Sequence, residues 1–197
     1  MLIYKLRYYI GIVVSKLFTT FIIWFFKRVN IGRGTIVYYK SSIVNLSKNG
    51  SINIGDGCLI GRSSLGYHAG MPFFTSILND GVESIVDVGC NCRINGAYIH
   101  AKKCITIGNN CVVASGVSII DSNGHETYST DRTVGVDTPE SVAIGDNVWI
   151  GLNAIVLKGT TIGNNSIVSA GSVVKGDFPE NSLISGNPGN IVKCLNI

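Results

Sequence analysis

The segment that decides the fold is residues 144–174, IGDNVWIGLNAIVLKGTTIGNNSIVSAGSVV. An aliphatic residue recurs in it every six positions, and a small or β-branched residue follows most of these four positions later. The aliphatic residues are Ile144, Ile150, Val156, Ile162, Val168 and Val174, and the later residues are Val148, Ala154, Thr160, Ser166 and Ser172. A period of six fits neither a helix nor a long strand, so it indicates short strands separated by regular corners.

The same spacing recurs upstream in other phases. It joins Ile54 to Ile60 and Val88 to Ile94, and it runs through Ile107, Val113 and Ile119. Three six-residue segments close one coil of about eighteen residues, and stacked coils form parallel sheets. Residues 30–197 are therefore predicted to form an all-β solenoid of about six or seven coils.

The period is lost in two places, near residues 62–87 and 121–142. Both gaps are rich in Gly, Ser, Thr, Asp and His, which favour loops over buried strands. We expect two excursion loops that leave the solenoid at these positions.

Residues 1–29 differ in composition from the rest, being largely aliphatic and aromatic. Lys5, Lys16 and Lys27 are spaced by eleven, so on a helix they would form one basic stripe. This pattern predicts a hydrophobic helix at the membrane surface. A helix that caps the solenoid or packs in an oligomer is the alternative, and a transmembrane span also stays open.

Composition excludes some classes of function. The chain is 46% hydrophobic, 14% charged and carries a formal charge of +4. Its basic residues do not line one face together with aromatic residues, as they do in a nucleic-acid-binding protein. Cys58, Cys92 and Cys111 occupy the small-residue position of the repeat, where a thiol acts as an apolar filler. We expect a reduced cytoplasmic protein without a metal site, because Cys90 and Cys92 lack a second pair of ligands.

The chain resembles the left-handed β-helix, hexapeptide-repeat acyltransferases, and within them the sugar and polysaccharide O-acetyltransferases. The matching segments are Ile94-Asn95-Gly96, Ile107-Gly108-Asn109-Asn110, Asp121-Ser122-Asn123-Gly124-His125, residues 144–151, Ser169-Ala170-Gly171-Ser172-Val173-Val174 and Gly186-Asn187-Pro188. The resemblance implies a left-handed coil, a homotrimer and acetyl-CoA as the acetyl donor. Zinc-dependent relatives with the same repeat carry a close pair of histidines, which His68, His100 and His125 do not form.

The resemblance assigns His125, on the second loop, as the general base that takes the proton of an attacking hydroxyl. Imidazole suits this role because it titrates near neutral pH. Asn95 matches a residue that orients the hydroxyl or the intermediate. Asp131 and Arg132 on the same loop, and Tyr67 and His68 on the first loop, are candidates for contact with the acceptor.

The resemblance also places acetyl-CoA between neighbouring subunits. The residues implied in its binding are Trp149, Gly151, Ala170, Gly171, Lys175, Pro188 and Lys193. Small residues let a ligand lie against the backbone, and the lysines suit phosphate groups.

These inferences together predict an acetyl-CoA-dependent O-acetyltransferase that modifies a surface polysaccharide or its lipid-linked precursor and lies on the cytoplasmic membrane. One alternative is N-acetylation of an amino sugar attached to a nucleotide, and another is a β-helix scaffold without catalysis.

Overall fold

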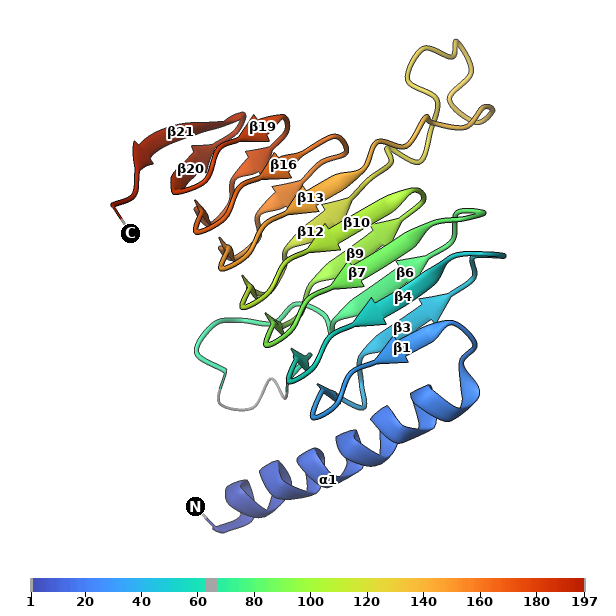
Figure 1. Cartoon of the computed structure of the whole chain (residues 1–197), viewed down its shortest axis with the longest axis vertical. Coiled ribbons are helices and arrows are strands. Elements are labelled where there is room, and N and C mark those ends of the chain that lie inside the picture. Colours follow the sequence, from blue (N-terminus) through green and yellow to red (C-terminus); the bar gives the residue numbers. More distant parts are fainter. Residues whose placement is uncertain (1, 63–66, 197) are drawn as a thin grey trace.

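The computed structural model describes residues 2–62 and 67–196, and it shows a solenoid with one helix across its N-terminal end (Figure 1). Three sheets form the walls of the solenoid, and the chain passes from sheet A to sheet B to sheet C in every complete coil. Their strands pair in parallel, except that the last strand of sheet B pairs antiparallel with its neighbour. We name the corners of the coil by the sheets they join. This arrangement fits the expected left-handed β-helix.

Sheet A contains β1 (Val29–Ile31), β4 (Ser51–Ile54), β7 (Ile85–Val88), β10 (Cys104–Ile107), β13 (Val142–Ile144), β16 (Thr161–Ile162) and β19 (Asp177–Phe178). Sheet B contains β2 (Ile36–Val37), β5 (Leu59–Ile60), β8 (Arg93–Ile94), β11 (Val112–Val113), β14 (Trp149–Ile150), β17 (Ile167–Val168), β20 (Ser182–Gly186) and β21 (Gly189–Cys194). Sheet C contains β3 (Ser42–Asn45), β6 (Ser76–Asn79), β9 (Tyr98–Ala101), β12 (Ser118–Ile120), β15 (Ile155–Val156) and β18 (Val173–Val174). The described strands make six complete coils and part of a seventh.

The core consists of aliphatic columns that run through the coils. In sheet B, parallel register stacks Val113 on Ile150 and Ile150 on Val168, and all three are fully buried. The six aliphatic residues identified in residues 144–174 are all buried, as their spacing predicts. Each fully buried side chain of this size contributes about 1.5–3 kcal/mol, and only stacking removes these faces from water.

The three thiols at the small-residue position form a column of their own. Each donates to the carbonyl of a glycine one coil further along, at 3.0–3.1 Å; the pairs are Cys58–Gly89, Cys92–Gly108 and Cys111–Gly145. A hydrogen bond with Cys92 and burial raise the pKa of Cys58 far above its ordinary value. A hydrogen bond with Cys111 raises the pKa of Cys92 to about 11. Cys58 and Cys92 are therefore protonated at neutral pH and act as structural fillers.

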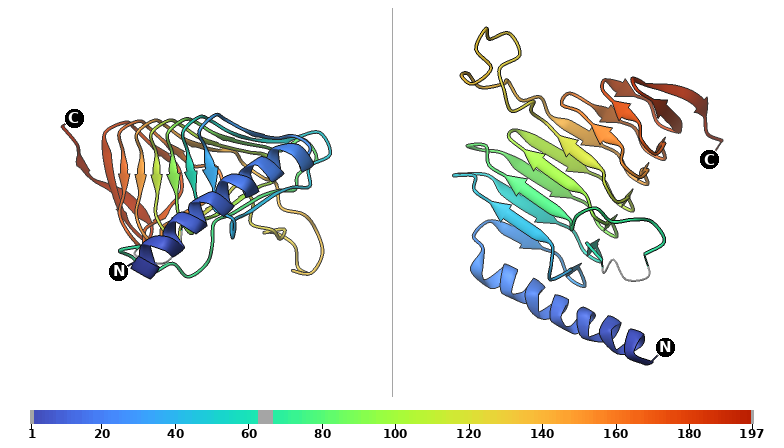
Figure 2. Two further views of the ribbon diagram at one scale, coloured as in Figure 1. Left: turned by 90° about the horizontal axis from the view of Figure 1, so that it is seen from below. Right: turned by 180° about the vertical axis from the view of Figure 1, so that it is seen from behind.

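The helix α1 (Leu2–Phe25) covers the first coil (Figure 2). Its inner face carries Ser15, Thr19 and Ile22, which are buried. Thr19 Oγ1 accepts a hydrogen bond from the backbone N–H of Val37 at 2.8 Å, and Ser15 Oγ accepts one from Tyr39 at 3.3 Å. The helix thus satisfies backbone donors that the end of a stack would leave open.

The basic stripe and the transmembrane span were the other expectations for this segment. Lys16 and Lys27 are exposed, and the side chain of Lys5 lies outside the described residues. In the described part of the chain, no helix combines the length and the apolar character needed to cross a membrane.

The first excursion is shorter than the sequence suggested. We expected a loop near residues 62–87, but residues 76–79 form β6 and residues 85–88 form β7, so the excursion ends at residue 75. The six-residue period is not visible in the sequence here, because the turn at residues 80–84 lengthens the C–A corner. Buried Asn79 donates to the Ser84 carbonyl across this turn at 2.8 Å, which holds the longer corner in place. The second excursion runs from residue 121 to residue 141, directly before β13.

Candidate active site

His125 lies on the second loop, which leaves the solenoid at the C–A corner between β12 and β13. Its side chain is exposed, and in the described part of the chain no hydrogen bond or ion pair holds the imidazole. Glu126, which follows it, accepts a hydrogen bond from the backbone N–H of Tyr128 at 3.2 Å and does not pair with His125. The ring nitrogens of His125 are therefore free to engage a substrate.

The start of this loop is fixed by Asp121, which is fully buried. Its carboxylate accepts hydrogen bonds from the backbone N–H groups of Lys102, Lys103 and Cys104 at 2.7–2.9 Å. Its carbonyl accepts a fourth from Glu140 at 2.9 Å. One residue thus joins the two ends of the loop to the coil below.

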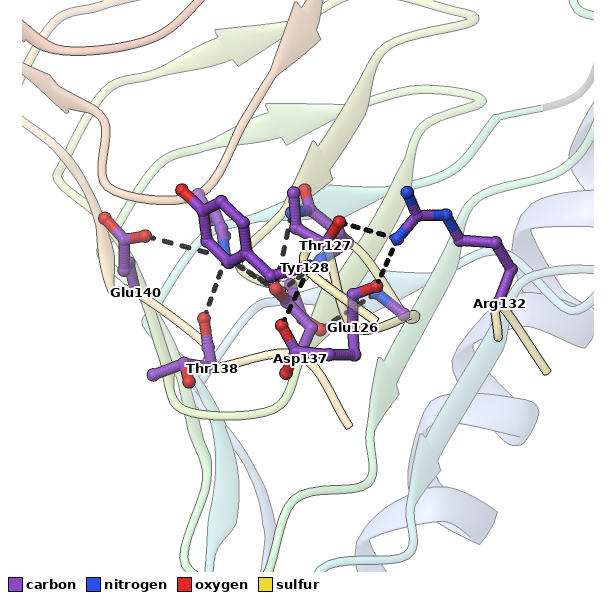
Figure 3. Close-up of polar contacts among 11 residues, drawn as sticks. Glu126, Thr127, Tyr128, Arg132, Asp137, Thr138 and Glu140 are labelled. Carbon is purple, nitrogen blue, oxygen red and sulfur yellow. Dashed lines mark hydrogen bonds and ion pairs between the residues drawn. The ribbon is translucent and has the colours of Figure 1, made fainter. Parts of the chain in front are cut away.

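A buried ion pair lies at the base of the same loop, close to Glu140 (Figure 3). Lys158 Nζ lies 2.7 and 2.9 Å from the two carboxylate oxygens of Asp137, and both residues are buried. Asp137 also accepts a hydrogen bond from the backbone N–H of Asn123 at 2.7 Å, two residues before His125. This pair therefore connects the His125 segment to the solenoid.

Burial alone would raise the pKa of Asp137, but the hydrogen bonds from Lys158 and Asn123 outweigh it and hold the pKa below its ordinary value. The hydrogen bond to Asp137 raises the pKa of Lys158. Both residues are charged at neutral pH. Their side chains have low exposure, so the pair is screened less by solvent than a surface salt bridge.

Asp131 and Arg132, predicted to contact the acceptor, both make hydrogen bonds inside the loop, and Figure 3 shows those of Arg132. Arg132 Nη1 donates to the carbonyls of Glu126, Thr127 and Ser129 at 2.6–3.2 Å. Hydrogen bonds from Thr133 lower the pKa of the Asp131 carboxyl. Both residues are exposed at the tip, so their observed role is to shape the loop that carries His125.

Asn95 lies at the B–C corner, directly after β8. The first loop packs on this corner: the buried Ser115 hydroxyl donates to the Gly70 carbonyl. Gly96 has φ +59°, and a Cβ there would lie 2.7 Å from Met71 Cγ. Tyr67 and His68 belong to the same loop, with their ring centroids 5.0 Å apart. These two candidates for acceptor contact therefore share a corner with Asn95.

The residues implied in acetyl-CoA binding gather mostly near the same corner, in the C-terminal coils. Gly151 and Ala170 are adjacent there, since a Cβ at Gly151 would lie 2.6 Å from the backbone nitrogen of Ala170. Packing between coils thus already requires this glycine. Gly171 has φ +71° and faces open space, and Ala170 is exposed, so backbone is available for a ligand to lie against.

Three of the remaining implied residues flank this corner. Exposed Trp149 and Lys193 lie in one register column of sheet B, through Ile167 and Leu183. The turn containing Pro188 lies over β18, because a Cβ at Gly189 would be 2.6 Å from a side-chain carbon of Val174. Lys175 follows β18 and lies at the C–A corner, whereas Lys193 lies in sheet B. Lys175 and Lys193 are therefore on different parts of the coil.

The structure does not bring His125 and Asn95 together within one chain. His125 leaves from the C–A corner, whereas Asn95, the first loop and most of the implied acetyl-CoA residues lie at the B–C corner. In Figures 1 and 2 the two loops project on opposite sides of the solenoid. One chain alone therefore does not assemble the complete set of candidate residues.

Two other features contribute nothing to this set. His100 Nε2 lies 2.9 Å from Asp80 Oδ1, which gives His100 a structural partner, and no cluster suited to a metal ion occurs among the described residues. A shallow groove of about 700 Å³ follows the polar outer face of sheet A, past Asn53, Thr106 and Asp146. None of the candidate site residues lines it.

Sequence reasoning missed Asp137, Lys158 and Ser115. A lysine inside a repeat of small and apolar residues was the available signal for Lys158, because a buried ammonium group requires a partner. Its partner lies 21 positions away in an irregular loop. Ser115 carried no signal, because serine is common at such corners.

Comparison with known proteins gives three kinds of match. Residues 141–175 match the family model described as hexapeptide repeat of succinyl-transferase. The chain is 32% identical over 163 residues to the putative lipopolysaccharide biosynthesis O-acetyl transferase WbbJ of Escherichia coli K12, covering 77% of this chain and 76% of that one. It is 36% identical over 92 residues to the galactoside O-acetyltransferase of the same organism, but spans only 45% of that relative. Among solved structures, the acetyltransferase VCA0836 of Vibrio cholerae with bound acetyl coenzyme A superposes with a TM-score of 0.53 at 29% identity, over 58% of this chain and 61% of that one.

Proposed function

Because the chain belongs to the hexapeptide-repeat acyltransferases, we propose that it transfers an acetyl group from acetyl-CoA to a sugar hydroxyl of a surface polysaccharide or its lipid-linked precursor. The observation that carries the reaction type is an unpaired imidazole, His125, on a loop whose base is fixed by Asp121 and by the Asp137–Lys158 pair. A general base needs this combination of a free ring nitrogen and a defined position.

In the proposed reaction, His125 takes the proton of the acceptor hydroxyl while its oxygen attacks the thioester carbonyl. The new C–O bond forms, the C–S bond breaks, and the imidazolium returns the proton to the leaving thiolate. Acetyl-CoA supplies only the activated acetyl group. Asn95 orients the hydroxyl or donates to the oxyanion, where a fixed donor has its largest effect.

We propose that the active site forms between subunits of a homotrimer. The separation of His125 and Asn95 onto different corners supports this arrangement, because a second copy would supply the residues that the first places elsewhere. Tyr67 and His68 of one subunit, with Asp131 and Arg132 of the next, would then border the acceptor. Trp149, Gly151, Ala170, Gly171, Pro188 and Lys193 would border acetyl-CoA, with Lys175 at its edge.

We further propose that the enzyme lies on the cytoplasmic face of the membrane through residues 1–29. The largely apolar outer face of α1 supports this placement, as do six cysteines that all remain unpaired, which suits a reducing compartment. An acceptor held on lipid would then meet the enzyme at the interface.

The first test is release of CoA from acetyl-CoA with lipid-linked glycans, free sugars and amino-sugar nucleotides as acceptors. Release that depends on a glycan hydroxyl supports the proposal. Release with amino-sugar nucleotides alone would replace it with N-acetylation, and a folded protein that fails to bind acetyl-CoA would indicate a scaffold.

The intersubunit site has its own test. His125→Ala and Asn95→Ala proteins are each expected to be inactive, but after subunit exchange roughly a quarter of the sites should hold both intact residues, because each site takes one residue from each of two subunits. Recovery of activity on mixing supports the shared site. A trimer that exchanges subunits without recovery would contradict it.

A further inference from the structure

Charge is distributed unevenly along the chain. Residues 1–62 contain nine Lys or Arg residues and a single acidic residue, Asp56, for a net charge of +8. Residues 63–197 contain seven basic and eleven acidic residues, for a net charge of −4. Because residues 1–62 form α1 and the first coil and a half, the positive charge is concentrated at the N-terminal end of the solenoid.

The outer face of α1 is apolar at this same end. Its inner face is occupied, since Ser15, Thr19 and Ile22 are buried against the first coil. On the other side Trp24 is 80% exposed and Leu17 67% exposed. From residue 9 onward, where the side chains of the helix are described, the other large exposed ones are Tyr9, Ile10, Val13, Val14, Phe21, Ile23 and Phe25. A helix docked on one face thus presents aromatic and aliphatic side chains on the other.

The first loop and the B–C corner of the first coil add a second apolar element, which we call the aromatic corner: Phe73 and Phe74 from the loop, and Tyr39 with Lys40 from the corner. The three rings are 36–41% exposed, and Lys40 Nζ lies 5.1 Å from the centroid of the Phe74 ring. The backbone N–H of Tyr39 bonds to Ser15 Oγ, which places the corner beside the middle of α1. In Figures 1 and 2 the first loop lies on the same side of the molecule as the N-terminal half of the helix.

We propose that the outer face of α1 and the aromatic corner form one surface that lies on an anionic lipid bilayer. The inference rests on the proposed membrane association of residues 1–29 and extends it to the first loop. Exposed aromatic side chains favour the interface between water and lipid, and basic side chains around them are attracted to anionic headgroups. The two elements together would hold the solenoid in one orientation, which a single helix does not fix.

Charge selects lipid over a second copy of this end as the occupant. Two N-terminal ends of net charge +8 would repel each other if they paired face to face, whereas an anionic bilayer neutralises the charge. Attachment should therefore weaken as salt rises and should require anionic lipid.

The test is flotation of the full-length protein with vesicles of phosphatidylcholine alone or mixed with phosphatidylglycerol. Phe73→Ser/Phe74→Ser and Lys40→Glu are the variants of the aromatic corner. Tyr128→Ser and Lys103→Glu are matched controls, since both positions are exposed but belong to the second loop and the fourth coil. We expect wild type to bind the anionic vesicles, the corner variants to bind about fivefold to tenfold more weakly, and the controls to bind as wild type.

The outcomes separate this inference from the proposed function. Wild-type binding that the corner variants retain in full would overturn the composite surface and leave the helix anchor standing. No binding by wild type would overturn the whole membrane placement, while CoA release with a soluble glycan would still report on the transferase. Assembly beyond the trimer without lipid, abolished by the corner variants, would assign the surface to contacts between copies instead. Circular dichroism and melting temperature show that each variant is folded.

Discussion

The first loop is held on its corner mainly by packing, whereas the second is held at its base by buried charge. Met71 and Phe73 lie against Gly96, and their loop ends in exposed rings. In the second loop, Asp121 and the Asp137–Lys158 pair provide directional hydrogen bonds. Packing tolerates variation in what a loop presents, but directional bonds fix the path of the chain. The loop that carries the proposed base is the one built for a fixed path.

The largest effect should come from His125→Ala. We expect CoA release to fall about 10²–10⁴-fold, because the hydroxyl loses its proton acceptor, with no change in melting temperature, because the side chain is exposed and unbonded. The matched change in the first loop, His68→Ala, should affect mainly the KM for the acceptor. If the two substitutions had equal effects on kcat, the functional contrast between the loops would be lost.

The second-largest effect should come from removing the charge of Lys158, which holds the base of the second loop. Lys158→Met leaves the buried Asp137 carboxylate without its cation and should reduce the free energy of unfolding by about 3–5 kcal/mol. Urea unfolding measures this change. Lys103→Met, at an exposed position, should change it by less than about 0.5 kcal/mol.

The double variant Lys158→Met/Asp137→Leu sharpens this result, because it removes the unpaired charge. It should recover much of the stability but not the activity, since Asn123 still loses its acceptor. Recovery of both would show that the pair does not position His125.

Packing under the first loop should give a smaller effect. Gly34→Ala and Gly96→Ala both place an alanine at positive φ, but only at Gly96 does the new Cβ meet the loop, at Met71 and Phe73. We expect a cost of about 1 kcal/mol at Gly34 and about 2–3 kcal/mol at Gly96, measured by urea unfolding. Equal costs would mean that the loop moves freely off its corner.

The smallest effect concerns pH. Because the folded pKa of Asp137 is lowered, its ion pair stabilises the fold above the ordinary value of 3.8, and that stability is lost as the pH falls through the folded pKa. The raised pKa of Lys158 keeps the pair intact well above neutral pH. Asp137→Asn costs less than Lys158→Met, because the amide oxygen can still accept from Lys158 and the Glu140 carboxylate remains 3.6 Å from the ammonium group. It should therefore lower the melting temperature by roughly 2–4 °C at pH 7, and the difference should shrink in acid. A difference that grew in acid would contradict the sign of the shift.

The coils were predictable because their signal is local. Ile150 and Val168 are separated by eighteen residues, which is three repeats of six, and both are buried in the structure. The end of the first loop was predicted wrongly. The five residues of the turn at 80–84 interrupt the six-residue period, so the sequence of β6 and β7 does not show it. The Asp137–Lys158 pair and the corner of each site residue depend on contacts between distant segments. Only the path of the chain around the solenoid determines them.

The column of thiols makes it possible to measure how each coil opens. Cys58, Cys92 and Cys111 sit in three successive coils, and none can meet a reagent until its own coil opens. The rates at which a maleimide labels them under native conditions therefore measure the opening of each coil separately. If Cys111 is labelled first and Cys58 last, the coils farther from α1 open more often than the coils next to it. The helix would then protect the N-terminal end of the solenoid from opening.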